Sequence, residues 1–270
     1  MDTLEKQFET EKGFIRYWIS PGKPEHPWLV FLPGLSADHH LFDQQVAFFA
    51  GEYPCLVWDA PAHAASRPFP LSFTMDDMAA YLHGILKAEG IEKPVLIGQS
   101  LGGYIAQCYM AMYPGTVSGF VSIDSASLSR KYFSGWELAL LKDTRWMYEM
   151  IPWKLLLKWG ISGTSQSACG RELMAKTWAA YDRKDYLDLT VHGYRILGEA
   201  VEARPEYKID CPAMLLCGEK DAAGSSKRYN RRWTKEEGHP LHWLKAAGHN
   251  SNTDAPEEVN RLIGRFLNSL

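Results

Sequence analysis

The stretch that decides the fold is VLIGQSLGG, at positions 95–103. Val95–Ile97 is apolar at every residue and is followed at once by Gly98, as expected of a strand buried on both faces. A helical pattern then begins at Ser100 and continues to about Tyr113. The letters GQSLG match the pattern Gly-x-Ser-x-Gly, in which a sharp turn from strand to helix holds a reactive serine in an exposed position. The flanking glycines allow the neighbouring backbone to pack closely. The alternative is that Ser100 is simply the N-cap of the helix.

Short apolar segments alternate with helical patterns on both sides of this turn. Further strands are expected at 14–19, 28–32, 55–58, 120–123, 213–217 and 241–244, and further helices at 41–50, 74–89 and 256–267. This alternation predicts an α/β fold with a mainly parallel central sheet and helices on both faces. Residues 125–204 break the pattern, because they contain no convincing strand but five of the ten tryptophans. We therefore expect a core domain formed by residues 1–124 and 205–270, with residues 125–204 inserted as a helical cap.

The overall composition argues against several classes of protein. The chain of 270 residues is 46% hydrophobic and 23% charged, as ordinary globular proteins are. Its net charge of -3 provides no basic surface for nucleic acid. The charged N-terminus lacks the apolar segment of a signal peptide, and no apolar run approaches the roughly 18 to 20 residues that cross a bilayer. We therefore expect a cytoplasmic protein without a stable membrane anchor.

The sequence also contains no recognisable metal or cofactor motif. The five cysteines include no C-x-x-C pair, which favours reduced thiols over disulfides or zinc ligands. An H-E-x-x-H motif and a nucleotide-binding P-loop are both missing. We expect neither a metal nor a cofactor, and the partner we expect is a small-molecule substrate. The sequence leaves the oligomeric state open.

Four further segments lie where a known enzyme family has its functional loops. They are LPGL at 32–35, WDAPAHAAS at 58–66, CGEKD at 217–221 and AGHN at 247–250. Together with the turn at Ser100 they resemble the α/β-hydrolase family over nearly the whole chain, and the order Ser, Asp, His is the order of this fold. The chain departs from the family pattern at Pro33, which replaces a histidine, and at Ala62 and Ala64, which replace glycines. These changes affect the shape of two loops more than the chemistry of the expected site.

The resemblance assigns a role to each side chain of that site. A serine hydroxyl is a weak nucleophile at neutral pH, so Ser100 needs a base to accept its proton, and His249 is the candidate. A third group must orient the imidazole and stabilise its cationic form. Asp221 is the candidate for this acid, and its other possible role is to cap the helix expected to begin soon after it. Asp124 is the alternative acid, because it also follows an expected strand.

Two backbone N–H groups are expected to form an oxyanion hole for the tetrahedral intermediate. Leu101 follows the nucleophile and supplies one of them. Leu35 supplies the other, because Pro33 has no N–H and Gly34 allows the unusual backbone angles of such a turn.

The aromatic residues of the inserted segment predict a lid over Ser100 with an apolar cavity beneath it, suited to a small hydrophobic substrate. The alternative is that these residues form the lid's own core. The pocket candidates are Gly34, His63, Trp136, Trp153 and Trp159.

The leading hypothesis for function is a serine hydrolase that cleaves a carboxylic ester of such a substrate through a Ser-His-Asp triad and an acyl-enzyme. A serine at this turn disfavours haloalkane dehalogenases and epoxide hydrolases, relatives that need a carboxylate nucleophile there. Cleavage of a lactone, thioester, amide or C–C bond uses the same triad and remains open. Two hypotheses come from other classes: a non-catalytic small-molecule receptor on the same scaffold, and a structural partner-binding protein. The receptor would be marked by a lost member of the triad.

Overall fold

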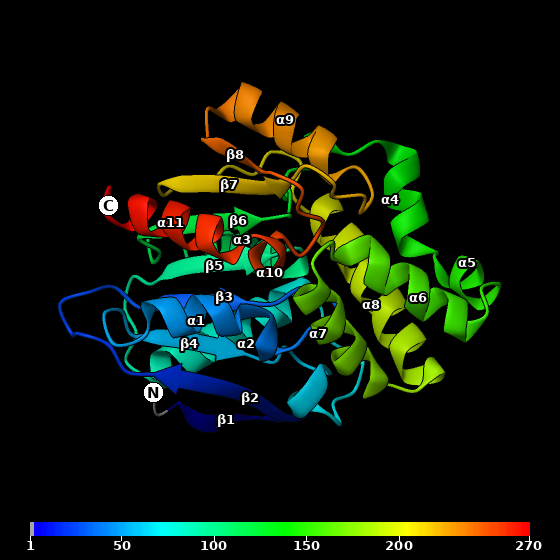
Figure 1. Cartoon of the computed structure of the whole chain (residues 1–270), viewed down its shortest axis with the longest axis horizontal. Coiled ribbons are helices and arrows are strands. Elements are labelled where there is room, and N and C mark those ends of the chain that lie inside the picture. The colour runs from blue at the N-terminus through cyan, green and yellow to red at the C-terminus, as the bar shows by residue number, and fades with distance from the viewer. Residues whose placement is uncertain (1–2) are drawn as a thin grey trace.

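The computed structural model describes residues 3–270, which form a central sheet of eight strands with helices on both faces (Figure 1). The strand order is β1-β2-β4-β3-β5-β6-β7-β8. β2 pairs antiparallel with β1 and with β4, whereas all other neighbouring pairs are parallel. The strands are β1 (Leu4–Thr10), β2 (Gly13–Ser20), β3 (Leu29–Leu32), β4 (Cys55–Trp58), β5 (Val95–Gln99), β6 (Gly119–Ile123), β7 (Ala213–Gly218) and β8 (Leu241–Leu244). This sheet confirms the predicted α/β fold.

The inner strands are apolar because both of their faces are covered. Every residue of β3, β4, β5, β6 and β7 is buried. Two-sided burial produces continuous apolar runs in the sequence instead of an alternating pattern. All expected strands are present, and β1 is an additional one. Its sequence, LEKQFET, is mostly polar because it forms an edge of the sheet, where no residue is fully buried and charged side chains discourage pairing with other chains.

The helices of the core cover both faces of this sheet. In Figure 1, α1 (Asp43–Phe49) and α11 (Pro256–Leu267) lie in front of the strands, and α2 (Met75–Ala88) and α3 (Leu101–Met112) lie behind them. α9 (Ser226–Glu237) packs against β7 and β8. The remaining short elements of the core are η1 (His39–Phe42), η2 (Ala64–Ser66) and α10 (Ser251–Asp254). The helix expected over residues 41–50 is divided between η1 and α1.

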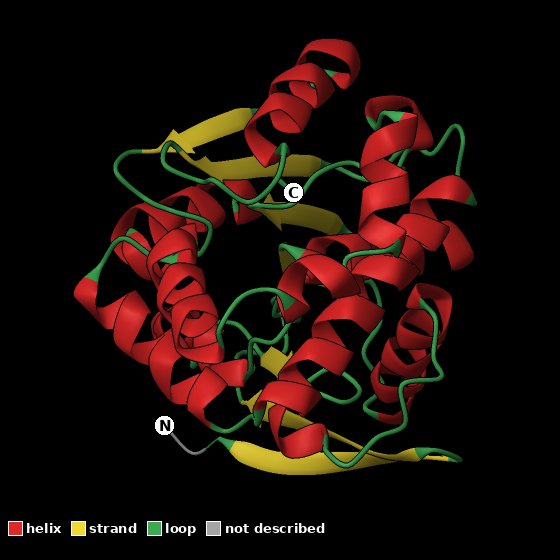
Figure 2. Ribbon diagram, turned by 90° about the vertical axis from the view of Figure 1, so that its right-hand side faces the viewer, coloured by secondary structure: helices red, strands yellow, loops and turns green. Residues whose placement is uncertain are grey.

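The segment between β6 and β7 is helical. It contains η3 (Arg130–Tyr132), α4 (Gly135–Lys142), α5 (Arg145–Glu149), α6 (Trp153–Thr164), α7 (Ala168–Ala179) and α8 (Arg183–Glu202), and no strand. We call α4–α8 the helical insertion. It lies at the carboxyl ends of the parallel strands, and Figure 2, which looks from this side, shows helices in front of the strand ends. The long helix α8 packs against α4 and also against α2 and α3, so it joins the insertion to the core.

Two further observations hold for the described residues. All five cysteines are free thiols in residues 3–270. Within the same residues, no helix is both long enough and apolar enough to cross a membrane.

Candidate active site

The turn between β5 and α3 holds Ser100 in an unusual backbone conformation. Its φ is 49° and its ψ is -118°, outside the regions that most residues adopt. The turn is possible because glycines surround it. A Cβ on Gly98 would lie 2.5 Å from the backbone of Gly102, and a Cβ on Gly102 would lie 1.8 Å from the carbonyl oxygen of Leu32. The Gly-x-Ser-x-Gly pattern therefore forms the strand-to-helix turn predicted for it.

His249 and Asp221 complete a hydrogen-bonded chain that starts at Ser100. The Nε2 atom of His249 lies 2.8 Å from the Oγ atom of Ser100. Its Nδ1 atom lies 3.0 Å from the Oδ1 atom of Asp221. His249 follows β8 and Asp221 follows β7, so the parallel sheet brings together three side chains that are far apart in the sequence. A Ser, a His and an Asp in this order of contacts allow a proton to pass from the serine to the imidazole.

The carboxylate of Asp221 is held by groups of its own loop. Ala223 N–H donates to Oδ1 over 2.8 Å, and the Ser226 hydroxyl donates to Oδ2 over 2.5 Å. Burial by itself would raise the pKa of Asp221, but the positive charge of His249 and these hydrogen bonds outweigh burial and hold the pKa below its ordinary value. Burial would likewise lower the pKa of His249, and the charge and hydrogen bond of Asp221 raise it instead. Each group thus stabilises the charged form of the other.

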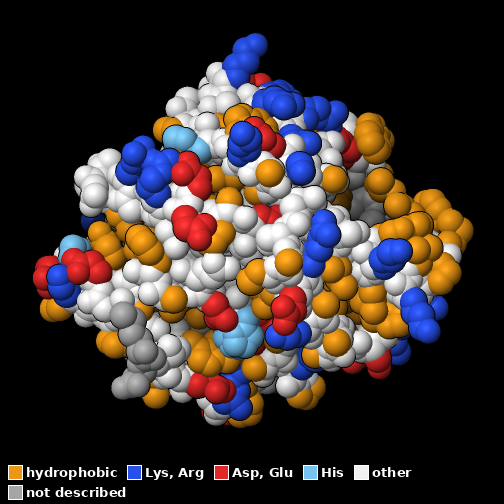
Figure 3. Space-filling view, viewed as in Figure 1, with side chains coloured by type: hydrophobic (Ala, Val, Ile, Leu, Met, Phe, Trp, Pro, Cys, Tyr) orange, Lys and Arg blue, Asp and Glu red, His pale blue; other side chains and the backbone are white. Residues whose placement is uncertain are grey.

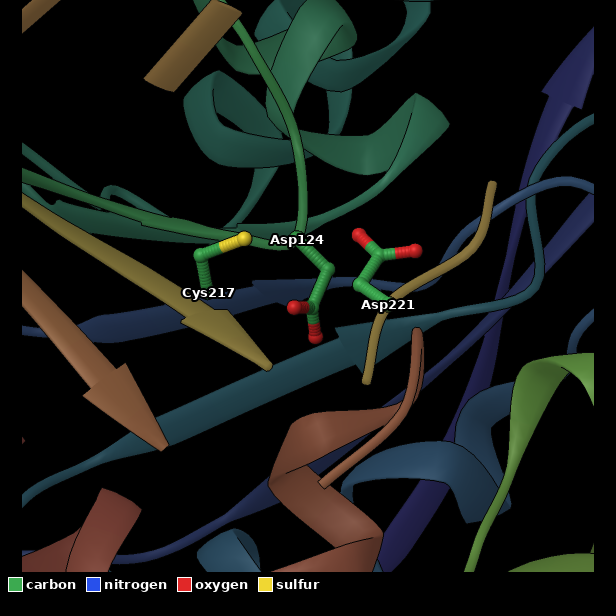
Figure 4. A group of neighbouring side chains, drawn as sticks. All are labelled: Asp124, Cys217 and Asp221. Carbon is green, nitrogen blue, oxygen red and sulfur yellow. The ribbon is translucent and has the colours of Figure 1, made fainter. Parts of the chain in front are cut away.

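Asp124 lies beside this pair but contacts other groups (Figure 4). It follows β6, and its two carboxylate oxygens accept from the backbone N–H groups of Gly218, at 2.7 Å, and Ser251, at 2.9 Å. Burial, and then the neighbouring charge of Asp221, raise the pKa of Asp124 to about 7. Asp124 therefore connects the end of β7 to the segment after His249 without a hydrogen bond to the imidazole. Between the two candidate acids, the geometry favours Asp221.

Asp124, Asp221 and Cys217 also form the one cluster of potential metal ligands within residues 3–270. One oxygen from each aspartate and the Cys217 sulfur all lie within 4.8 Å of one another. Both carboxylates are already engaged in the hydrogen bonds described above. Burial raises the pKa of the Cys217 thiol, so the thiol stays protonated. We therefore interpret the cluster as part of the structure that holds His249 in place, and not as a metal site.

Gln99 ties the His249 loop to the turn at Ser100. Its Nε2 atom donates to the carbonyl oxygen of His249 over 2.8 Å and to the Oδ1 atom of Asn250 over 3.2 Å. Gln99 is buried at the end of β5, directly before the serine. The sequence carries one signal for this role, which is a polar residue at the end of an otherwise apolar strand.

The two leucines expected to form the oxyanion hole lie beside Ser100. Leu35 and Leu101 both line the cavity above the serine. In residues 3–270, neither backbone N–H donates a hydrogen bond to another protein group. The turn at Leu35 lies so close to the end of β5 that it requires glycine at position 34. A Cβ on Gly34 would lie 2.3 Å from Gln99 Oε1.

A cavity of about 200 Å³ opens above Ser100 between the core and the helical insertion. Its core side includes Leu35, Ser36, Gln99, Leu101, Tyr104 and His249. The insertion contributes Tyr148, Leu156, Gly160, Thr164, Met174, Trp178, Tyr186, Thr190, Tyr194 and Leu197. The insertion therefore forms one side of this cavity, and the aromatic side chains in the lining are mainly tyrosines.

The structure places none of the five predicted pocket residues in the lining of this cavity. Trp136 is 67% exposed and Trp159 is 55% exposed, and both lie outside the cavity lining. Figure 3 shows hydrophobic side chains gathered on the outer face over α4–α6. Trp153 packs against Tyr186, with ring centroids 5.3 Å apart, and does not line the cavity. On α6 the cavity is lined by residues 156, 160 and 164, which are four residues apart. Trp159 lies outside this helical face, whereas Trp153 shares it but lies at the start of the helix, one turn before residue 156.

The two remaining pocket candidates, His63 and Gly34, lie on loops of the core. His63 is buried, and its Nδ1 atom donates to the carbonyl oxygen of Pro61 over 2.9 Å. Gly34 approaches Gln99, as described above, and shapes the turn at Leu35. Neither residue lines the cavity. The cavity lining also includes residues of α8 that the sequence did not single out, and their positions 186, 190, 194 and 197 share one helical face.

Comparisons with known proteins agree with this fold. A family model described as the alpha/beta hydrolase fold matches residues 27–256, and the chain belongs to this family. It is 27% identical over 262 residues to the 2-succinyl-6-hydroxy-2,4-cyclohexadiene-1-carboxylate synthase of Serratia proteamaculans, a match that covers 92% of this chain and 96% of that protein. It is 25% identical over 289 residues to epoxide hydrolase 4 of Mus musculus, covering 95% of this chain and 77% of that protein.

Among solved structures, the Cif epoxide hydrolase from Acinetobacter nosocomialis has a similar fold. Its TM-score to this chain is 0.80 with 17% sequence identity, and the match covers 98% of this chain and 89% of that one. At this identity the likeness shows the fold alone.

Proposed function

We propose that the protein is a serine hydrolase that cleaves a carboxylic ester of a small, largely apolar substrate. The observation that carries the proposal is the hydrogen-bonded chain from Ser100 through His249 to Asp221. The side chain at the turn is a hydroxyl, so we do not propose the carboxylate-nucleophile chemistry of epoxide hydrolases. A receptor on this scaffold would not need three side chains connected for proton transfer.

The geometry supports a reaction in two halves. Ser100 Oγ attacks the ester carbonyl while His249 Nε2 accepts its proton, and Asp221 stabilises the imidazolium that forms. The N–H groups of Leu35 and Leu101 hold the negative oxygen of the tetrahedral intermediate. The intermediate collapses when the C–O bond breaks and the imidazolium gives its proton to the leaving alcohol. Water then attacks the acyl-enzyme by the same steps, which releases the acid and restores Ser100.

Labelling and turnover test this proposal directly. We expect a fluorophosphonate to label Ser100, and p-nitrophenyl esters with short acyl chains to be hydrolysed fastest, because the cavity of about 200 Å³ is small. Ser100→Ala should abolish labelling and lower kcat by about 10⁴-fold or more. Ser122→Ala is a matched control, because Ser122 is a buried serine of β6 outside the cavity lining, and it should keep wild-type kcat. Equal turnover by wild type and Ser100→Ala, or no labelling of wild type, would reject the proposal and favour a receptor.

We also propose a cytoplasmic location for this enzyme. The five free thiols support it, because disulfides are rare in reducing compartments. Fractionation of the source cells tests it, and recovery of the protein outside the cytoplasm would contradict it.

A further inference from the structure

The helical insertion is hydrogen-bonded to the loop that carries His249. We call residues 245–250, between β8 and α10, the His249 loop, and residues 165–167, between α6 and α7, the α6–α7 turn. Asp254, at the end of α10, bonds to both. Its Oδ2 atom accepts from the backbone N–H groups of Gly248 and Gln166, each over 2.8 Å, and its Oδ1 atom accepts from the N–H group of Ser167 over 2.9 Å. One carboxylate therefore joins the residue before His249 to two residues of the insertion.

Other contacts join the same two segments. The Asn250 N–H group donates to the carbonyl oxygen of Thr164 over 2.8 Å, and Asn250 Nδ2 donates to Ser165 Oγ over 3.2 Å. In Figure 1 the helices α7 and α10 lie side by side. They touch so closely that a Cβ on Gly170 would lie 2.8 Å from Thr253 Oγ1. A shift of one segment therefore strains the contacts of the other.

The backbone of His249 is held from three directions. Asp254 accepts from the N–H group of the preceding residue, Gln99 donates to the carbonyl oxygen of His249 over 2.8 Å, and Thr164 accepts from the N–H group of the following residue. The imidazole must meet both of its triad partners at once, at 2.8 Å and 3.0 Å. A misplacement of about 1 Å can lower the rate of a reaction about 100-fold, so these backbone contacts bear on catalysis. Two of the three lead to the insertion.

The same part of the insertion forms a wall of the cavity. Leu156, Gly160 and Thr164 line the cavity, and α6 ends at Thr164, directly before the α6–α7 turn. A movement of this wall is therefore passed to the turn and, through Asp254, to the His249 loop. Hydrogen bonds to a charged acceptor are stronger than those between neutral groups, which makes the carboxylate the strongest part of this connection.

We propose that Asp254 is a positioning residue that connects the helical insertion to the catalytic base, so that the α6–α7 turn and the His249 loop are held as one unit. The proposal rests on the serine hydrolase function proposed above and concerns the regulation of the same site. His249 is aligned with its triad partners only while the α6–α7 turn is in place.

Replacement of Asp254 tests the connection from the side of the carboxylate. Asparagine keeps the shape of the side chain but has one acceptor oxygen, so at least one of the three N–H groups loses its acceptor, and alanine removes both oxygens. We expect kcat for the best p-nitrophenyl ester to fall about 3- to 10-fold in Asp254→Asn and about 10- to 100-fold in Asp254→Ala. Thermal unfolding checks that each variant is folded. If Asp254→Ala does not fold, Asp254→Asn decides.

The ionisation of His249 reports on the position of its ring. Burial would lower the pKa of His249, but the charge and hydrogen bond of Asp221 and then the charge of Asp124 raise it above the ordinary 6.5. An imidazole displaced from Asp221 loses part of this stabilisation. In Asp254→Asn the pKa of His249, measured by NMR titration and assigned with His249→Gln, should therefore fall towards 6.5. A loss of stability alone leaves this pKa unchanged in the folded protein.

Gly170→Ala tests the connection from the side of the insertion. The new Cβ would lie 2.8 Å from Thr253 Oγ1 and 3.0 Å from Asp254 Oδ1, so it pushes the start of α7 away from α10. Gly170 itself lies outside the cavity lining. We expect Gly170→Ala to lower kcat and the pKa of His249, as Asp254→Asn does. Gly163→Ala is the matched control, because its Cβ would meet nothing within 4 Å, and it should change neither quantity.

Asp210→Asn is the control for a carboxylate that joins two segments. Asp210 Oδ2 accepts from the Gly115 N–H group over 2.9 Å, and these residues precede β7 and β6, at the edge of the sheet opposite Ser100. Asp210→Asn should keep the wild-type kcat and the wild-type pKa of His249. A folded Asp254→Asn variant with both wild-type values would overturn the proposal. A lower kcat with an unchanged pKa would overturn it too, because Asp254 would then act elsewhere than on the imidazole.

The titration keeps this outcome distinct from failure of the esterase proposal, because it needs no turnover. A wild-type protein that hydrolyses no ester would reject the esterase proposal. The pKa of His249 in Asp254→Asn and Gly170→Ala would still decide whether the insertion holds the imidazole in place.

Discussion

Replacing Asp221 with asparagine removes the charge from the hydrogen-bonded chain with almost no change in volume. The amide oxygen can occupy the position of Oδ1, where it would still accept from His249 Nδ1 and from Ala223 N–H. The amide nitrogen would then face the Ser226 hydroxyl, which can accept as well as donate. The packing of the loop is therefore preserved, and the main loss is the negative charge that stabilises the imidazolium in the transition state.

The size of this loss follows from the geometry. Nδ1 and Oδ1 are 3.0 Å apart, so the centres of the two charges are separated by about 4 Å. Two unit charges at about 4 Å interact by about 4 kcal/mol at an effective dielectric constant of about 20. This corresponds to a decrease in kcat of about 10³-fold. If the amide instead turns its nitrogen toward His249 and forces the wrong tautomer, the decrease rises to about 10⁴-fold.

The assay is steady-state hydrolysis of the best p-nitrophenyl ester, with folding checked by circular dichroism and thermal unfolding. Asp124→Asn is the matched control, because within residues 3–270 Asp124 accepts hydrogen bonds only from the backbone N–H groups of Gly218 and Ser251. It should lose stability by about 1–3 kcal/mol, since an amide satisfies only one of the two N–H groups, but keep kcat within about tenfold. A kcat for Asp221→Asn within tenfold of wild type would refute the reasoning. A larger loss in a folded Asp124→Asn variant would transfer the acid role to Asp124.

Two further predictions concern the pH dependence of kcat/KM and the turn at Leu35, whose backbone N–H is expected to bind the oxyanion. His249 must be neutral to accept the proton of Ser100, and Asp221 raises the pKa of His249 above the ordinary 6.5. As the pH drops below this raised pKa, kcat/KM should therefore fall tenfold per pH unit. Above the raised pKa, kcat/KM should level off. A pH profile with its acid limb centred well below 6.5 would contradict this. Gly193→Ala should press on the Leu35 side chain and lower kcat about tenfold or more. Gly163→Ala is the control, because its Cβ would meet nothing within 4 Å. It should leave kcat unchanged and stabilise α6 by about 0.5–1 kcal/mol. Equal kcat values for the two alanine variants would show that α8 does not position the turn.

Much of the fold could be predicted because its signals are local. A strand buried on both faces is a run of apolar residues, and a helix that follows it shows its own spacing, so the segments from β2 to β8 are visible one at a time. The edge strand β1 has no such signal, because only its pairing with β2 makes it a strand. The turn at Ser100 is recognisable for the same reason, because the glycines that it requires lie within five consecutive residues.

The choice between Asp221 and Asp124 shows where local signals end. Each aspartate directly follows a buried strand, and the sheet places the two strands side by side, so the sequence around them favours neither decisively. The distances decide: Asp221 is within hydrogen-bond reach of the imidazole, and Asp124 is committed to two backbone N–H groups.

The cavity shows the same division more strongly. The sequence alone indicates that residues 125–204 form an aromatic helical segment, because their composition and their lack of a strand pattern can be read without the fold. Which aromatic side chains face Ser100 depends on the rotation of each helix about its axis, and that rotation is set by packing. α8 rests on α3 and on Leu35, so it presents tyrosines and Thr190 to the cavity, while Trp136 and Trp159 face outward. Only the assembled fold selects the side chains that meet the substrate, because contacts between distant segments choose the face that each helix turns inward.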